Sequence, residues 1–157
     1  MSLSAAAQTS LAKWRAMVAN NDYADLSSII AIDAIFHSPV EWHPYPGRDL
    51  VCLLVRAAAE VFEDFKYLRE FIGTDCVALE FSAHIGEVEL RAVHLIRFNA
   101  AGEFADIDKV MRPAEGVKAL GHAMGLKIGP QAKAALDALK QPDRNAQPKD
   151  APEFAGN

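Results

Sequence analysis

Cysteine is scarce in this sequence of 157 residues, and long hydrophobic runs are absent from it. The two cysteines, Cys52 and Cys76, make neither a disulfide framework nor a zinc knuckle. No run reaches the roughly 18 apolar residues that a membrane-spanning helix needs. The first residues lack a basic segment followed by a long apolar core, which argues against a secretory signal. We therefore expect a cytoplasmic protein with no membrane partner.

Positive charge is in deficit. The sequence has 16 Lys and Arg against 21 Asp and Glu, which gives a formal net charge of −5. A chain without a basic cluster binds nucleic acid poorly, because contacts to phosphate supply most of that affinity. The glycine-rich fingerprints of dinucleotide and phosphate sites are absent, as are the HExxH and GxSxG motifs. These absences predict no nucleic-acid partner and no cofactor.

Residues 39–47 are rich in proline and end in glycine, which predicts a loop. His37, Glu41 and His43 in or beside this loop could be imagined as metal ligands. Their spacing differs from the helical His spacing of known zinc sites, so we predict no metal site.

The composition that is present is that of an ordinary globular domain, with 51% hydrophobic and 24% charged residues. A length near 150 residues fits one domain. The last part of the chain holds three prolines and few large apolar side chains, so we expect disorder there. The predicted organisation is a lead-in at residues 1–10, one domain at residues 11–140 and a disordered tail at residues 141–157.

Hydrophobic periodicity predicts both helices and strands. Apolar residues recur at helical spacing, or capping residues mark a helix, at residues 8–20, 22–28, 48–65, 114–124 and 130–139. Period-two alternation, or β-branched and aromatic content, marks strands at residues 29–37, 77–85, 89–98 and 104–111. Strands that follow one another through short turns pair antiparallel, so the predicted class is α+β.

One face of the predicted sheet is apolar with two polar exceptions, His94 and Lys109. The face follows from pairing Asn99 with Gly102 across the hairpin. That register pairs His94 with Ile107, Ala92 with Lys109, and Leu90 with Met111, on a face that also holds Ile96, Phe98 and Ala105. A buried polar group costs a few kcal/mol unless it is satisfied, so the two exceptions mark a candidate pocket.

The opposite face of the same strands mixes charged with apolar side chains. It holds Val93, Leu95, Arg97, Phe104, Asp106, Asp108 and Val110. Too many of these are apolar for free exposure. One interpretation is a homodimer interface, and the other is a face that a helix covers or that is only half exposed.

The order of the elements and two stretches of sequence resemble the NTF2-like superfamily. FHSPVEWHPYPGRDL, at residues 36–50, resembles the strand end, loop and helix start of its SnoaL-like and ketosteroid-isomerase-like members. IRFNAAGEF, at residues 96–104, resembles their penultimate hairpin. The resemblance covers residues 11–124. It implies a cystatin-like cone, in which a curved antiparallel sheet wraps on a long helix with N-terminal helices and an internal apolar cavity, and it implies frequent dimers.

The resemblance also implies where the isomerase residues of the superfamily would lie. The position of the general base, an Asp before the proline that ends the first strand, is Ser38 here. The oxyanion-binding Tyr corresponds to Trp14, and the protonated Asp that assists it corresponds to His94. Serine cannot take a proton from carbon as a carboxylate does, and Trp has no acidic hydroxyl. Ketosteroid isomerisation by that residue set is therefore not expected, although the pocket position is.

A second set of catalytic residues known in the superfamily is the Asp–Arg–Asp set of its epoxide hydrolases. Arg97, Asp106 and Asp108 resemble it in type. The register above places all three on the outer face, where a surface salt bridge worth under about 1 kcal/mol is the simpler interpretation.

We therefore expect an apolar cavity that binds a small hydrophobic or carbonyl-bearing metabolite. His94 is the candidate catalytic residue of an isomerase-, cyclase- or hydrolase-like reaction. The candidate ligand-binding residues are Trp14, Phe36, Ser38, Phe62, Ala92, Ile96, Phe98, Ile107, Lys109 and Met111. Two structural alternatives stay open, a core histidine bonded to a neighbour at His94 and an edge lysine that reaches water at Lys109. The functional alternative is a non-catalytic ligand-binding or interaction module that acts as a homodimer.

Overall fold

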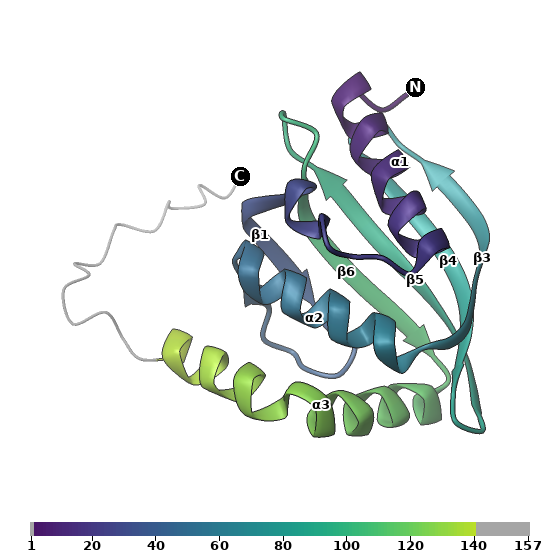
Figure 1. Cartoon of the computed structure of the whole chain (residues 1–157), viewed down its shortest axis with the longest axis vertical. Coiled ribbons are helices and arrows are strands. Elements are labelled where there is room, and N and C mark those ends of the chain that lie inside the picture. Colours follow the sequence, from purple (N-terminus) through teal and green to yellow (C-terminus); the bar gives the residue numbers. More distant parts are fainter. Residues whose placement is uncertain (1, 141–157) are drawn as a thin grey trace, which may run out of the picture.

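The computed structural model of the protein describes residues 2–140, which form three α-helices and a six-stranded sheet (Figure 1). The elements follow one another as α1 (Ala5–Asn20), η1 (Leu26–Ser28), β1 (Ile30–His37), β2 (Tyr45–Pro46), α2 (Arg48–Val61), β3 (Glu63–Ile72), β4 (Cys76–Ile85), β5 (Val88–Phe98), β6 (Phe104–Arg112) and α3 (Ala114–Lys140). The predicted α+β class is confirmed.

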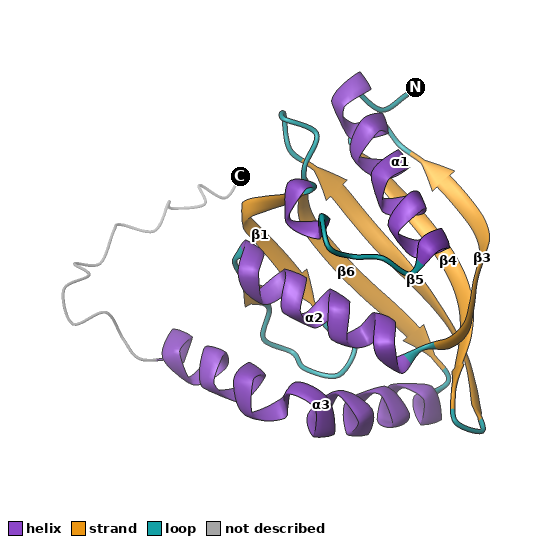
Figure 2. Ribbon diagram, viewed as in Figure 1, coloured by secondary structure: helices purple, strands orange, loops and turns teal. Residues whose placement is uncertain are grey.

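The strands form one curved sheet in the order β2-β1-β6-β5-β4-β3. All neighbours pair antiparallel except β1 and β6, which run parallel. The sheet is therefore mixed and not wholly antiparallel as predicted, because the rule for short turns does not apply to two strands that residues 38–103 separate. Figure 2 shows α1 and α2 over one face of the sheet, with α3 beside α2 at one end.

α1 begins earlier than its hydrophobic pattern predicts. Ser4 caps the helix, and its Oγ accepts a hydrogen bond from the N–H of Ala7 at 3.2 Å. Residues 5–10, predicted as a lead-in, are therefore helical. The helix buries Leu11 and Trp14, and the Trp14 ring lies edge-on to Phe104 of β6, so α1 packs directly on the sheet.

The end of α2 differs most from the prediction. The sequence predicts a helix through Phe65, but α2 ends at Val61 and Phe62 is already extended. β3 follows at once and pairs antiparallel with β4, with Tyr67 opposite Phe81. The segment is rich in aromatic residues, which favour strands, and β4 supplies its partner. Pairing with a distant strand thus ends the helix before its apolar pattern does.

The loop between β5 and β6 contains one residue more than predicted. Asn99 pairs with Glu103 instead of Gly102, and its N–H donates to the Glu103 carbonyl at 2.9 Å. Gly102 has a positive φ of 78°, as the last residue of a three-residue hairpin loop commonly does. The first pairs of the hairpin are therefore shifted by one residue.

A β-bulge at the start of β6 adds a second shift. Phe98 pairs with Phe104, whereas the next residue back, Arg97, pairs with Asp106. The two shifts sum to two residues, so side chains beyond the bulge keep their predicted faces although their partners change. The observed pairs are Ile96 with Ile107, His94 with Lys109, and Ala92 with Met111. Phe104 precedes the bulge and is buried on the inner face, not on the outer face as predicted.

α3 is one helix instead of the two predicted. Pro130 lies inside it, although an interior proline removes a helical hydrogen bond and costs about 3 kcal/mol or more. Leu120 and Ile128 are buried, and α3 lies against α2, so packing offsets that cost. No helix within residues 2–140 is long and apolar enough to cross a membrane. The tail predicted at residues 141–157 lies outside the described residues.

The core consists of two apolar clusters. The larger cluster joins α1, α2, β1 and part of the sheet, and Leu26 and Val51 at its centre are fully buried. The smaller cluster holds Phe81 and its neighbours on β4 and β5. The His94 ring packs against Trp14 of the larger cluster and Phe81 of the smaller one. His94 therefore lies at the boundary between the two clusters.

Candidate functional site

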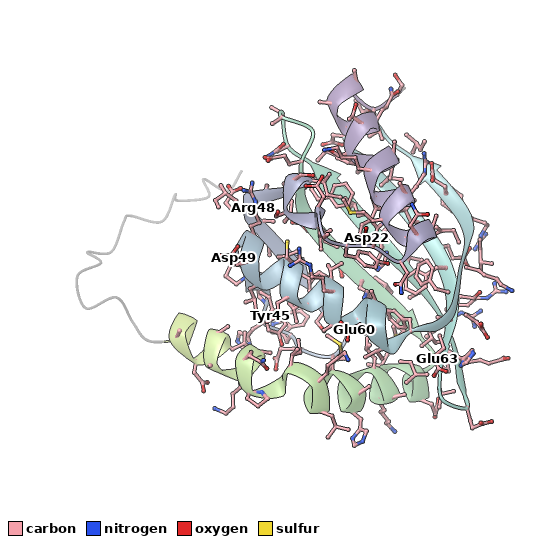
Figure 3. All side chains as sticks on the ribbon, in the orientation of Figure 1. Asp22, Tyr45, Arg48, Asp49, Glu60 and Glu63 are labelled. Atoms are coloured by element: carbon pink, nitrogen blue, oxygen red, sulfur yellow. The ribbon has the colours of Figure 1, made fainter. Side chains whose placement is uncertain are left out.

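A pocket of about 230 Å³ lies between α1, α2 and the inner face of the sheet. Its walls are mostly apolar and come from five segments of the chain. They are formed by Trp14, Val18, Asn21, Tyr23, Ile30, Phe36, Val55, Ala58, Ala59, Phe62, Phe65, His94, Ile96, Phe104, Ile107 and Lys109. No carboxylate of the described residues lines it. The acidic side chains Asp49 and Glu60 of α2, labelled in Figure 3 near the two ends of that helix, are not among the lining residues.

His94 is the buried polar side chain of this pocket without a partner. It lies on β5, between Leu79 of β4 and Lys109 of β6, and its side chain is on the face that α1 covers. The Nδ1 atom has no hydrogen-bond partner among residues 2–140. Burial, and then the nearby charge of Lys109, hold the pKa of His94 well below its usual value. The imidazole is therefore neutral at neutral pH.

Lys109 is buried beside His94, so it is not the water-reaching edge lysine of the alternative interpretation. Its Nζ lies 4.9 Å from the ring centroid of Phe62 and 5.7 Å from that of Phe36, within cation–π range. No carboxylate of residues 2–140 forms an ion pair with it. Burial lowers the pKa of Lys109 to about 8. The side chain thus brings a weakly solvated amine into an apolar space.

Trp14 forms one wall of the pocket, but its polar atom is already used. The Nε1–H donates a hydrogen bond to the hydroxyl of Tyr67 on β3 at 2.7 Å. Burial raises the pKa of Tyr67, so its hydroxyl stays protonated. Trp14 therefore offers a ligand its ring face and not its N–H.

The structure brings together most of the predicted site residues. The pocket is lined by Trp14, Phe36, Phe62, His94, Ile96, Ile107 and Lys109. Ala92, Phe98 and Met111 do not line it. Phe98 packs edge-on against Phe104, while Ala92 and Met111 belong to the Phe81 cluster.

Ser38 also lies outside this pocket. Its Oγ accepts a hydrogen bond from the N–H of Val40 at 3.1 Å, which is a local turn at the end of β1. It lines a second pocket of about 500 Å³ between α2, α3 and the loop after β1. Tyr45, seen between α2 and α3 in Figure 3, is another wall of that pocket.

The two pockets share three residues, Phe36, Ala58 and Lys109. The Lys109 side chain therefore lies at the boundary between a smaller chamber that contains His94 and a larger one under α3. A ligand bound at Lys109 has apolar space on both sides.

Several pocket residues were not predicted from the sequence. Phe104 was assigned to the wrong face because the bulge was not foreseen, and Phe65 was assigned to a helix. Tyr23 lies in the loop after α1, because the helix predicted at residues 22–28 is reduced to the short 3-10 helix Leu26–Ser28. Val55 and Ala58 lie within residues 48–65, where apolar residues recur at helical spacing, and that spacing is the sequence signal for this wall.

The Asp–Arg–Asp candidates lie outside the pocket. Arg97 Nη2 contacts Asp106 Oδ2 at 3.0 Å, and His37 Nε2 lies 3.5 Å from the other oxygen of the same carboxylate. These side chains are partly exposed on the outer face. His43 lies 3.5 Å from Glu41 in the loop. Within residues 2–140 there is no group of three or more His, Cys, Asp or Glu side chains that could hold a metal ion.

Neither protein-family models nor the sequences of curated proteins match the chain. Solved structures do. A steroid delta-isomerase from Pseudomonas aeruginosa is 36% identical, with a TM-score of 0.80 over 83% of this chain and 97% of that one. A protein with a cystatin-like fold from Silicibacter pomeroyi is 31% identical, with a TM-score of 0.73 over 79% of this chain and 88% of that one.

An NTF2-like protein from Mesorhizobium loti is 16% identical, with a TM-score of 0.62 over 72% of this chain and all of the other, 100%. That identity shows the shared fold alone. The two closer structures cover nearly their whole length at above 30% identity, and the pocket lies where the curved sheet meets its helices. The chain belongs to the NTF2-like superfamily with the cystatin-like fold.

Proposed function

We propose that the smaller pocket binds a compact, largely apolar metabolite by a carbonyl group placed between His94 and Lys109, and that the protein catalyses proton transfer at the carbon next to that carbonyl. One observation carries the proposal: His94 and Lys109 are buried side by side in a mostly apolar pocket. Within residues 2–140, His94 Nδ1 has no hydrogen-bond partner and Lys109 has no ion pair. Small-molecule sites are typically built in this way, with a few polar groups in apolar walls.

The size of the pocket limits the ligand. A volume of about 230 Å³ lies just below the roughly 300–1,000 Å³ of most small-molecule sites. Aromatic rings of Trp14, Phe62 and Phe104 form much of the wall, which suits a ring or another flat apolar group. The proposed ligand is therefore a one- or two-ring molecule, or a short branched chain.

Lys109 would stabilise the charge that develops when the proton leaves. Loss of a proton next to a carbonyl places negative charge on the oxygen, and a fixed cation in a water-poor site stabilises such charge strongly. The ammonium of Lys109 has no competing carboxylate in the described structure, so it is free to donate to that oxygen.

His94 would take the proton. A neutral imidazole has one ring nitrogen without a proton, and the low pKa of His94 keeps it in that form. Protonating His94 beside Lys109 alone would be costly, since two cations would then lie close together. When the proton comes from the ligand, the enolate offsets the charge of Lys109 at the same moment.

The relative from Pseudomonas aeruginosa supports the same class of reaction, because its name is steroid delta-isomerase and it is 36% identical. The isomerase residues of the superfamily cannot carry the reaction here. Ser38, at the position of the general base, lies outside the smaller pocket, and Trp14, at the oxyanion-binding position, has its N–H engaged.

The absence of a carboxylate from the lining favours the second candidate function, a carrier that binds the same molecule without turnover.

The test is isomerisation of cyclohex-3-en-1-one to its conjugated isomer, followed by ultraviolet absorbance. The wild-type protein should accelerate this reaction, and His94→Ala should lower the rate by at least about 100-fold, as loss of a general base does. His84→Ala is the matched control, because His84 lies on β4 outside the pocket, paired with Asp64 at 2.9 Å. Equal rates for wild type and His94→Ala, with both folded, would reject His94 as the base.

Binding is measured separately so that a carrier is recognised. Trp42 is 91% exposed and Trp14 lines the pocket, so in Trp42→Phe the fluorescence reports on Trp14 alone. Saturable quenching without turnover would establish the carrier. Neither quenching nor turnover would contradict both candidate functions.

The outer face of the sheet supports a homodimer as the assembly of this protein. Leu95 of β5 pairs with Ala78 of β4, which pairs with Phe71 of β3, and these form an apolar band in which Leu95 and Phe71 are exposed. The Arg97–Asp106 pair lies beside it. A patch with an apolar centre and both signs of charge suits a contact in which the patch meets its own copy.

A further inference from the structure

Lys109 differs from the other lysines of the described chain in what surrounds its amine. Lys13, Lys127 and Lys133 each pair with a carboxylate. Lys66 and Lys118 are exposed to solvent. Lys109 has neither a carboxylate nor open solvent, and its polar atom points into pocket space between two phenylalanine rings.

This environment increases the fraction of the neutral amine, which is the nucleophilic form. Burial lowers the pKa of Lys109 from 10.5 to about 8. About a tenth of such a side chain is uncharged at pH 7, against fewer than about one in a thousand for an exposed lysine. The titratable side chains that line the two pockets are His94 and Tyr23 on one side and Glu41, Tyr45, Lys133 and Asp137 on the other.

The position of Lys109 adds a geometric argument. Its side chain lies where the two pockets meet, together with Phe36 and Ala58. A carbonyl carbon at this boundary can have one apolar group beside His94 and another under α3. The amine can then approach the carbonyl from the wall, while its substituents remain in the two chambers.

We propose that Lys109 is a nucleophile that forms a covalent imine with an aldehyde or ketone ligand, with His94 moving the protons. This inference rests on the proposed function and names its covalent step. The amine nitrogen bonds to the carbonyl carbon, and the carbonyl oxygen takes a proton to give a carbinolamine. The hydroxyl then takes a second proton and leaves as water, so one carbonyl and one ammonium become one protonated imine and one water.

The imine would also assist the proton transfer already proposed. A protonated imine withdraws electrons from the adjacent carbon more strongly than a neutral carbonyl does. The proton on that carbon is then acidic enough for a weak base such as His94. Lys109 faces His94 directly across β5 and β6, so both steps can occur at one ligand carbon.

The experiment is reductive trapping with sodium cyanoborohydride and 4-phenylbutan-2-one, a methyl ketone with one aromatic ring. Intact mass spectrometry should show one addition equal to the ketone less one oxygen atom, and peptide mapping of wild-type protein should place it on Lys109. Lys109→Arg keeps the charge and should remove the addition. Lys118→Arg, a change at an exposed lysine, should leave it intact.

The pH dependence supplies a second readout. Trapping on Lys109 should rise with pH and level off above about pH 8, while the slow reaction of exposed lysines continues to rise toward pH 10. A yield on Lys109 that rises in parallel with the exposed lysines would overturn the inference, as would additions spread over surface lysines.

The two proposals fail in different ways. If the ketone quenches Trp14 fluorescence saturably and no addition forms on Lys109, the imine is wrong and the binding function stands. If the ketone neither quenches Trp14 nor is trapped, both are contradicted.

Discussion

His94 and Lys109 are buried next to each other, and within residues 2–140 His94 Nδ1 has no hydrogen-bond partner and Lys109 has no carboxylate partner. An unpaired buried polar group costs about 1–3 kcal/mol, and apolar side chains at both positions would extend the core without that cost. Both residues lie on strands that otherwise bury Ile96 and Ile107 on the same face. A destabilising arrangement of two adjacent polar groups in a pocket is the strongest sign of function in this molecule.

The cost of burying Lys109 predicts how stability depends on pH. The folded chain holds the pKa of Lys109 at about 8, and the ordinary value is 10.5. Between these pH values the unfolded chain binds a proton that the folded chain does not, so wild-type stability rises with pH. Lys109→Met lacks this dependence. Its stability advantage should be largest below pH 8 and should shrink by about 2–3 kcal/mol by pH 10.5.

Urea unfolding of the wild type and of Lys109→Met at pH 7.5 and pH 10 measures the difference in their free energies of unfolding. The contributions of other titrating groups cancel in that difference. Lys118→Met is the control, because Lys118 is exposed and should follow the wild type at both pH values. Parallel curves for wild type and Lys109→Met would show that Lys109 is charged or solvated in the folded protein as it is in the unfolded one.

At the scale of elements, the hairpin shows what sequence patterns can and cannot predict. Period two placed His94 and Lys109 on one face, because alternation is a local property of a strand. The length of the loop after β5, by contrast, depends on a tertiary contact and not on the local pattern. A Cβ on Gly102 would lie 2.4 Å from the carbonyl carbon of Ala6, so contact with α1 requires glycine there. The partner of His94 depends on that contact and on the bulge that follows.

β3, which closes one side of the pocket, likewise depends on a tertiary contact. The apolar stripe of α2 continues in sequence through Phe65, so periodicity alone extends the helix. Pairing with β4 is a long-range interaction, and it turns Phe65 and Tyr67 onto the sheet, where Tyr67 accepts the hydrogen bond of Trp14. The sequence thus predicted the faces that form the pocket, while the strand that closes one side depends on tertiary contacts.

Ser38 lines the larger pocket, which α3 covers, and not the pocket that contains His94. The resemblance put Ser38 at a catalytic position, and the structure has it in a turn beside the space that α3 covers. Two short helices were predicted because Pro130 usually begins a helix. One continuous helix instead roofs a larger chamber, which no local pattern indicated.

At the scale of the whole molecule, the outer face of the sheet predicts self-association. Leu95 is 43% exposed at one end of the band that it forms with Ala78 and Phe71. Leu95→Asp would bury a charge in an apolar contact and should convert the proposed dimer into a monomer. Sedimentation velocity measures the change.

The matched control is Leu126→Asp. Leu126 is 76% exposed on α3, away from this face, so its replacement should leave the sedimentation unchanged. A wild type that sediments as a monomer, or a Leu95→Asp variant that sediments as the wild type does, would rule out this interface.

The fold of the whole molecule does not by itself determine the reaction, because the superfamily fold hosts more than one function. The walls from α1, α2 and β1 set the size of the ligand, and the strands β5 and β6 supply its chemistry. Enzyme and carrier share these walls and differ only in what His94 and Lys109 do. The claim common to both is that a carbonyl binds at these two side chains.

That claim is tested most directly by a crystal structure of the protein with 4-phenylbutan-2-one. We predict electron density for the ketone between α1, α2 and the inner face of the sheet, with its carbonyl carbon at Lys109 Nζ and its ring against Trp14 or Phe62. Density for the ketone at another site, with His94 and Lys109 surrounded by their own neighbours alone, would contradict carbonyl binding at these two side chains.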